Sequence, residues 1–149
     1  MEKLIIVAGS PNSGKTLSVN STIQKLYTKG AIIKEYLFGS KIDFWKGKRG
    51  GAIIANFDNK EIAIISYGDI VCALDEVFTS KEVLACDIII CCSHATRGKR
   101  VFEYLHNYIK TEINLSSTKV IPIYKNLLSG YGQETVENEQ TANLLLELI

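Results

Sequence analysis

The sequence predicts an α/β protein, a three-layer sandwich in which helices cover both faces of a mostly parallel sheet of about five or six strands. Short apolar runs alternate along the chain with stretches whose apolar residues recur at helical spacing. The apolar runs are mostly continuous, as in strands that are buried on both faces. Two β-rich runs that flank Asp58-Asn59-Lys60 also predict one antiparallel hairpin.

Size and charge limit the kinds of protein that fit this sequence. The chain has 149 residues, 46% of them hydrophobic, so we expect one globular domain over residues 1–149. Lys and Arg total 17 against 16 Asp and Glu, and this near-neutral balance gives no indication of nucleic-acid binding. The longest apolar runs are far short of the ~20 residues that span a bilayer. We therefore expect a cytoplasmic protein without a membrane segment.

The cysteines fit that expectation. Cys72, Cys86, Cys91 and Cys92 include no Cys-x-x-Cys pair. Adjacent residues of a strand point to opposite faces, so Cys91 and Cys92 could not chelate one zinc ion together. We interpret the cysteines as reduced residues of the core.

In the first half of the chain, apolar patterns place each element in order. Strands are predicted over residues 3–8 and 31–37, a helix over 15–28, an exposed loop over 38–51, and hairpin strands over 52–57 and 61–67. The loop prediction depends on missing apolar periodicity and on Gly50-Gly51 at its end.

In the second half, a helix begins after Gly68-Asp69, and Ser80 is a candidate cap for a further short turn. A strand over residues 87–92, a helix over 100–113, a strand over 119–124 and a helix over 134–148 follow. Pro122 lacks a ladder donor, which places its strand at a sheet edge. Val136, Leu145 and Leu148 are the expected inward residues of the last helix.

One motif carries most of the chemistry. The first strand leads directly into Gly9-Ser10-Pro11-Asn12-Ser13-Gly14-Lys15-Thr16, and a helix follows. Gly9 and Gly14 allow the backbone to curl so that successive N–H groups point into one concavity that binds anions. The positive end of the helix dipole points to the same place. A phosphate chain is the ligand that such a loop suits.

This stretch fits the pattern G-x-x-x-x-G-K-[ST] between a strand and a helix, and over residues 3–28 the chain resembles the P-loop NTPase superfamily. The resemblance implies a nucleotide-binding α/β domain that uses Mg²⁺. Residues 9–16 would hold the nucleotide. Lys15 would reach the β- and γ-phosphates, and the Thr16 hydroxyl would bind Mg²⁺.

The superfamily also implies a second acidic residue, at the carboxyl end of the strand beside the P-loop strand, which holds Mg²⁺ through water. Asp69 follows the run at 62–65 at that end, and it is our candidate metal and catalytic residue. It is equally placed to be a turn residue and helix N-cap. Asp87 precedes its strand and would lie at the wrong end. Because three residues separate Asp69 from its run, Ser66 and Glu35 remain alternatives.

A basic segment follows the strand over residues 87–92. Arg97 and Arg100 would oppose the helix dipole at the start of the next helix, a conflict that a bound phosphate would remove. In related small-molecule kinases, lid arginines stabilise the transferring phosphoryl group, so both are catalytic candidates, with solvated side chains as the alternative. His94 could orient a nucleophile, or it could be a packed structural residue.

The loop over residues 38–51 combines Phe44 and Trp45 with lysines and an arginine. Such a loop could stack a base and contact phosphate, or it could be a surface loop with no ligand. In P-loop kinases and switch GTPases, the insertion at this position recognises a second substrate or a partner.

Three functions remain open at this stage. The first is Mg²⁺-dependent hydrolysis of the β–γ bond of ATP. The second is a small-molecule or nucleotide kinase whose acceptor is held by residues 38–51. The third is a non-enzymatic nucleotide-binding module. ATP is favoured over GTP because no Asn/Thr-Lys-x-Asp motif follows a late strand. A protein partner or an oligomer is compatible with each.

Overall fold

The computed structural model describes residues 1–38, 50–67, 71–94, 99–126 and 133–149. The central part of the expected loop, residues 39–49, lies outside this description. The described elements, in chain order, are β1 (Lys3–Gly9), α1 (Lys15–Thr28), β2 (Ile32–Phe38), β3 (Ala52–Phe57), β4 (Lys60–Ile65), α3 (Val71–Phe78), α4 (Lys81–Leu84), β5 (Ile88–His94), α5 (Lys99–Glu112), β6 (Lys119–Lys125) and α6 (Gln133–Leu148).

The described strands form one six-stranded sheet in the order β2-β3-β4-β5-β1-β6. Strands β4, β5, β1 and β6 pair in parallel, which confirms the mostly parallel sheet. The predicted hairpin is the antiparallel pair β3–β4, and β2 adds a second antiparallel pair by joining β3. The sheet therefore has one more antiparallel pair than the single predicted hairpin. The reason is that residues 32–38 form β2 at the far edge of the sheet, not beside β1.

A tight turn closes the β3–β4 hairpin. Asp58 and Asn59 have φ angles of 50° and 61°, and the two-residue turns that match strand twist require positive φ at both positions. Asp and Asn tolerate this conformation better than most side chains do. Lys60 begins β4, so the turn is one residue shorter than the sequence pattern indicated.

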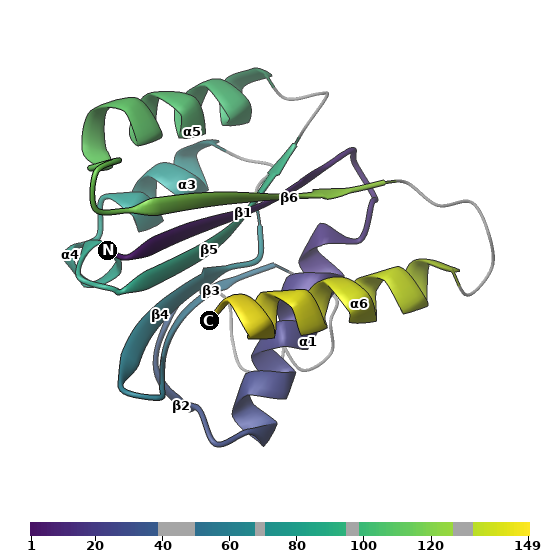
Figure 1. Cartoon of the computed structure of the whole chain (residues 1–149). Helices are drawn as coiled ribbons and strands as arrows, with labels where there is room; N and C mark the ends of the chain where they lie inside the picture. Colours follow the sequence, from purple (N-terminus) through teal and green to yellow (C-terminus); the bar gives the residue numbers. More distant parts are fainter. Residues whose placement is uncertain (39–49, 68–70, 95–98, 127–132) are drawn as a thin grey trace.

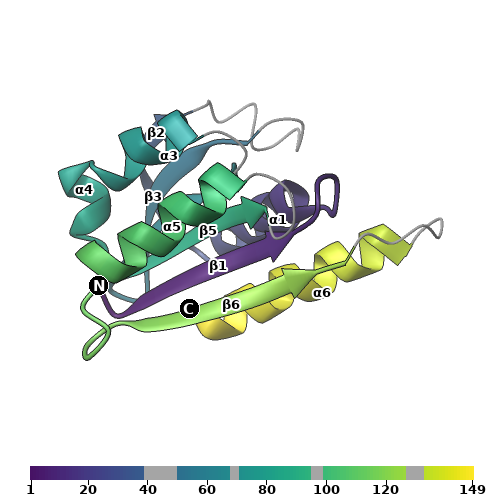
Figure 2. The same cartoon turned by 90° about the horizontal axis from the view of Figure 1, so that it is seen from above.

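Helices cover both faces of the sheet, as the sequence predicts. Figure 1 shows α3, α4 and α5 on one face and α1 with α6 on the other, and Figure 2 shows the same arrangement from above. Alternate residues of β5 point to the two layers. Ile89 and Cys91 belong to the core cluster under α3 and α5, whereas Ile90 and Cys92 belong to the cluster under α1 and α6. Cys91 and Cys92 thus face opposite sides.

Other local predictions can be compared directly. The Ser80 hydroxyl caps α4 by accepting from the Val83 amide at 3.4 Å, and β6, which contains Pro122, is an edge strand. Val136 was wrongly expected to point inward, since it is 58% exposed, while Leu145 is fully buried. The next two residues, Glu137 and Asn138, take the inward positions of this turn by contacting Lys125. Among the described residues, no helix combines the length and apolar character needed to cross a membrane.

Candidate functional site

The segment over residues 9–16 connects the carboxyl end of β1 to the start of α1. In the parallel register, Gly9 lies opposite His94 of β5 and Lys125 of β6, so three strand ends meet beside the segment. A cavity of about 340 Å³ opens there, lined by residues 11–17 with Cys92, His94 and Glu134. This is the edge of an open α/β sheet where ligands bind.

Lys15 lies inside the concavity of the loop. The residue is 6% exposed, and its ammonium group donates hydrogen bonds to the carbonyl oxygens of Ser10 at 2.8 Å and Gly9 at 3.2 Å. The amide of Ser13 donates to the Ser10 carbonyl at 3.2 Å, which closes the turn. The loop therefore folds around one positive charge.

Two features show that the loop fits an anion. The Ser13 hydroxyl is buried and has no hydrogen-bond partner among the described residues, so a polar group in the loop remains to be satisfied. The first turn of α1 has no side-chain cap and no acidic residue. Its N–H groups and the helix dipole therefore face the loop with no acidic side chain in the first turn of the helix. The residues present fit a phosphate chain.

Thr16, the candidate Mg²⁺ ligand, is held from β4. Its hydroxyl donates a hydrogen bond to the Ser66 carbonyl at 2.8 Å. A hydroxyl that donates its proton in this way still has lone pairs for a cation. The Ser66 side chain itself accepts from the Gly51 amide at 2.9 Å, and the Ser66 amide donates to the Gly51 carbonyl at 2.8 Å. Ser66 thus meets Thr16 through its backbone oxygen, not through its hydroxyl.

The strand beside β1 is not the one that the sequence predicts. We expected the strand that precedes Asp69 to lie beside β1, but β5 lies between β4 and β1. The contact from Thr16 to Ser66 shows that the carboxyl end of β4 nevertheless reaches the loop. Asp69 itself is in the segment 68–70, outside the described residues.

The two other acidic candidates are placed away from the loop. Glu35 is on β2, at the far edge of the sheet from β1. Asp87 precedes β5, and its carboxylate accepts from the Glu61 amide at 2.9 Å at the opposite end of the sheet, as the sequence predicts. Neither residue lies at the carboxyl end of β4 that contacts Thr16.

The basic segment after β5 is placed in part. His94 ends β5 and lines the cavity beside the loop. Arg97 lies outside the described residues, and Arg100 is in the first turn of α5 with a side chain that lies outside them. Phe44, Trp45 and the basic residues beside them also fall outside the description. Their candidate roles therefore stay predictions.

The chemistry of the described residues near the site is that of a phosphate site more than of a metal cage. No three His, Cys, Asp or Glu side chains of the described residues gather around a possible metal. Magnesium, however, is usually held by one or two protein ligands together with phosphate oxygens and water. Tyr67 follows Ser66, and burial raises the pKa of its phenol to about 12.

Sequence reasoning missed residues from the C-terminal third of the chain. Lys125 is buried against α6 and forms an ion pair with Glu137 at 2.7 Å. Asn138 lies against Gly14, and Glu134 lines the cavity. In the sequence, Lys125 looks like any lysine at the end of an edge strand. Nothing there indicated that it is buried against α6 and paired with Glu137.

Comparisons of the chain with protein-family models, with curated proteins and with solved structures found no match.

Proposed function

We propose that this chain is a Mg²⁺-dependent P-loop NTPase that binds a nucleoside triphosphate, with ATP favoured, and hydrolyses its β–γ phosphate bond. One observation carries the proposal. The G-x-x-x-x-G-K-T segment lies between a buried parallel strand and the uncapped N-terminus of α1, with the Lys15 ammonium group inside the loop. A cavity of about 340 Å³ beside it leaves room for a ligand.

Each residue of the loop has a role in this proposal. The backbone N–H groups of residues 9–16 and the start of α1 bind the phosphate oxygens. Lys15 exchanges its carbonyl partners for the β- and γ-phosphates and offsets their charge. Thr16 holds Mg²⁺ through an oxygen that the Ser66 carbonyl orients. When bound, Mg²⁺ supplies charge stabilisation at the oxygens of the transferring phosphoryl group.

The central test is Lys15→Ala, measured by calorimetric titration with MgATP. We expect the variant to lose binding because no other described cation lies in the loop, while its fold stays intact by circular dichroism. Lys25→Ala is the matched control, since Lys25 is on the same helix but bonds to Glu139 at the protein surface. Unchanged MgATP affinity in Lys15→Ala would overturn the proposal.

Labelled ATP distinguishes hydrolysis from the other functions. Free phosphate released without an acceptor supports an NTPase, label transferred to a metabolite supports a kinase, and binding without either reaction supports a module. Thr16→Ala should change the Mg²⁺ dependence of turnover, and Thr16→Ser should largely restore it. Asp69→Asn should weaken the Mg²⁺ dependence too, and an unaltered Mg²⁺ profile would remove Asp69 from the site.

A further inference from the structure

A buried polar network lies directly behind the phosphate loop. Lys125, at the end of β6, has a side chain with no exposure to solvent. Its ammonium group is within hydrogen-bond distance of Glu137 at 2.7 Å, Asn138 at 3.0 Å and Thr141 at 3.3 Å, all on α6. A buried lysine with three partners from one helix fixes where that helix lies relative to β6.

The two glycines of the loop each pack against one member of this network. A Cβ atom on Gly9 would lie 2.5 Å from the Ser13 hydroxyl oxygen and 2.8 Å from the backbone carbonyl oxygen of Lys125, its strand neighbour. A Cβ atom on Gly14 would lie 2.2 Å from the Asn138 side-chain oxygen. Gly14 also has a φ of 79°, a conformation that L side chains rarely adopt. The loop is therefore in contact with Lys125 at its start and with Asn138 at its end.

Asn138 is also connected to the loop through a hydrogen bond. The Ser18 hydroxyl is 3.1 Å from the Asn138 side-chain oxygen and 2.9 Å from the Gly14 carbonyl oxygen. The Ser18 amide donates to the same Gly14 carbonyl at 2.9 Å. Lys125, Asn138 and Ser18 thus form a chain of contacts that ends on the peptide group at the start of α1.

We propose that Lys125 and Asn138 are positioning residues of the phosphate loop. The Lys125 ammonium group holds the Asn138 side chain against Gly14, where the loop N–H groups converge, so that binding phosphate costs little rearrangement. Neither side chain has to touch the nucleotide. This inference depends on the proposed function, because it concerns the affinity of the same loop for a phosphate chain.

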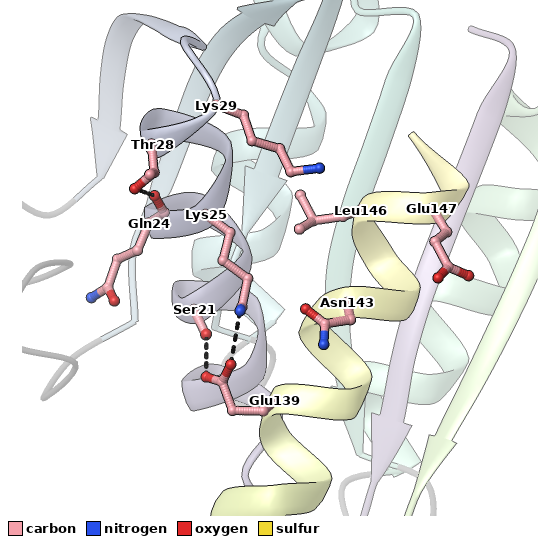
Figure 3. Close-up of a pocket in the computed structure, with 9 residues that line it drawn as sticks. All are labelled: Ser21, Gln24, Lys25, Thr28, Lys29, Glu139, Asn143, Leu146 and Glu147. Atoms are coloured by element: carbon pink, nitrogen blue, oxygen red, sulfur yellow. Dashed lines mark hydrogen bonds and ion pairs between the residues drawn. The ribbon is translucent and has the colours of Figure 1, made fainter.

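The protein contains a natural control for this network. Figure 3 shows Glu139 of α6 reaching Ser21 and Lys25 of α1 in a surface groove. The Lys25–Glu139 ion pair is 2.8 Å long and about a third to a half exposed, and the Ser21 hydroxyl donates to Glu139 at 2.8 Å. These contacts join the same two helices without touching residues 9–16. A variant at Glu139 therefore tests helix docking apart from loop positioning.

The experiment compares MgATP affinity, by calorimetry, with the melting temperature of the ligand-free protein. Asn138→Leu should weaken MgATP binding about tenfold, equivalent to about 1.4 kcal/mol. Ser18→Ala removes a single hydroxyl and should weaken binding in the same direction by a smaller factor. Asn138→Gln keeps an uncharged amide that can accept from Lys125 and should bind better than Asn138→Leu. Glu139→Gln should bind like the wild-type protein.

Each outcome decides the inference. Wild-type affinity in both Asn138→Leu and Ser18→Ala, with Lys15→Ala inactive, would overturn this inference and leave the proposed function in place. Equal losses of affinity in Glu139→Gln and Asn138→Leu would assign the effect to helix docking and would also overturn it. An absence of MgATP binding in the wild-type protein would overturn the inference together with the proposed function.

Discussion

The helices within the two layers of the protein are joined to one another by different chemistry. The layer of α3 and α5 packs through aromatic rings, with the Phe78 and Tyr108 ring centroids 4.6 Å apart and those of Phe78 and Tyr104 6.3 Å apart. The layer of α1 and α6 has an apolar core too, but polar contacts join its two helices. Asn138 of this second layer lies against Gly14 of the loop.

We therefore expect the two layers to differ in what they contribute to stability and to nucleotide affinity. The burial of apolar surface is non-directional, so it supplies stability without fixing individual atoms. A buried hydrogen-bonded network fixes atoms in one arrangement, because any shift leaves a buried polar group without a partner. We therefore expect substitutions in the first layer to change stability alone, and buried substitutions in the second to change nucleotide affinity as well.

The largest expected effect separates stability from affinity. Phe78→Ala should lower the free energy of unfolding by about 3–5 kcal/mol, because Phe78 is 2% exposed in the core under α3 and α5. Urea denaturation measures this loss, and Phe78→Leu should lose less. MgATP affinity should stay at the wild-type value below the unfolding transition. A loss of affinity that matched the loss of stability would contradict the division between the layers.

A variant at Lys125 should lose slightly less stability, and it should also bind MgATP more weakly. Lys125→Met should cost about 3 kcal/mol, since it leaves the Glu137 carboxylate without its buried partner. This is the low end for a broken buried pair, because the Glu137 side chain is 24% exposed. The same variant should weaken MgATP binding. Urea denaturation and calorimetry together would refute the expectation if only stability changed.

The aromatic layer should also show a distinct response to alkaline pH. Burial, followed by the nearby Glu112 charge, raises the pKa of Tyr108 to about 12, so the folded protein holds the neutral phenol. In the unfolded chain the phenol loses its proton near pH 10. Its contribution to stability is therefore complete below pH 10 and lost as the pH rises toward 12.

Tyr108→Phe tests this pH dependence. The Tyr108 hydroxyl is buried and has no hydrogen-bond partner among the described residues. Its removal should leave stability at pH 7 equal to that of the wild type, or up to about 1 kcal/mol higher. The alkaline decline in the urea midpoint should become shallower. An identical decline in the variant and the wild type would exclude Tyr108 as a cause.

The smallest effect is expected at the surface of the second layer. Glu139→Gln should change the free energy of unfolding by less than about 1 kcal/mol, because exposed ion pairs contribute little and are screened by salt. The hydrogen bond from Lys25 lowers the pKa of Glu139, so its small contribution is lost as the pH falls below the usual range of a glutamate. A loss of several kcal/mol, or one insensitive to added salt, would show that this pair is not a simple surface contact.

Local signals explain why part of the site could be predicted. The strand, loop and helix over residues 3–28 carry their signal in consecutive residues, and α1 begins and ends where the apolar spacing predicted. The turn at Asp58 and Asn59 could also be predicted from the sequence, because short polar side chains tolerate positive φ. Such features depend on neighbours in the sequence, and the fold does not have to be known to recognise them.

Strand order and long-range contacts could not be read in this way. The apolar runs of β4 and β5 are alike, so nothing in them indicates which one pairs with β1. The inward side of α6 begins with the polar residues Glu137 and Asn138, which contact Lys125. A pattern based on apolar residues alone predicts Val136 instead, although Val136 is exposed. These choices depend on tertiary contacts, such as the pairing of Lys3 with Ile88 and the contact of Asn138 with Ser18.

The sequence by itself determined an α/β fold and a glycine-rich loop between a strand and a helix at residues 9–16, because helix, strand and glycine-rich loop are encoded by local spacing. Only the tertiary structure decided what surrounds that loop. It placed the Ser66 carbonyl against Thr16, and Lys125 and Asn138 against Gly9 and Gly14. The physical reason is that a buried polar group needs hydrogen-bond partners. Those partners come from strands and helices that are brought together only when the sheet is assembled.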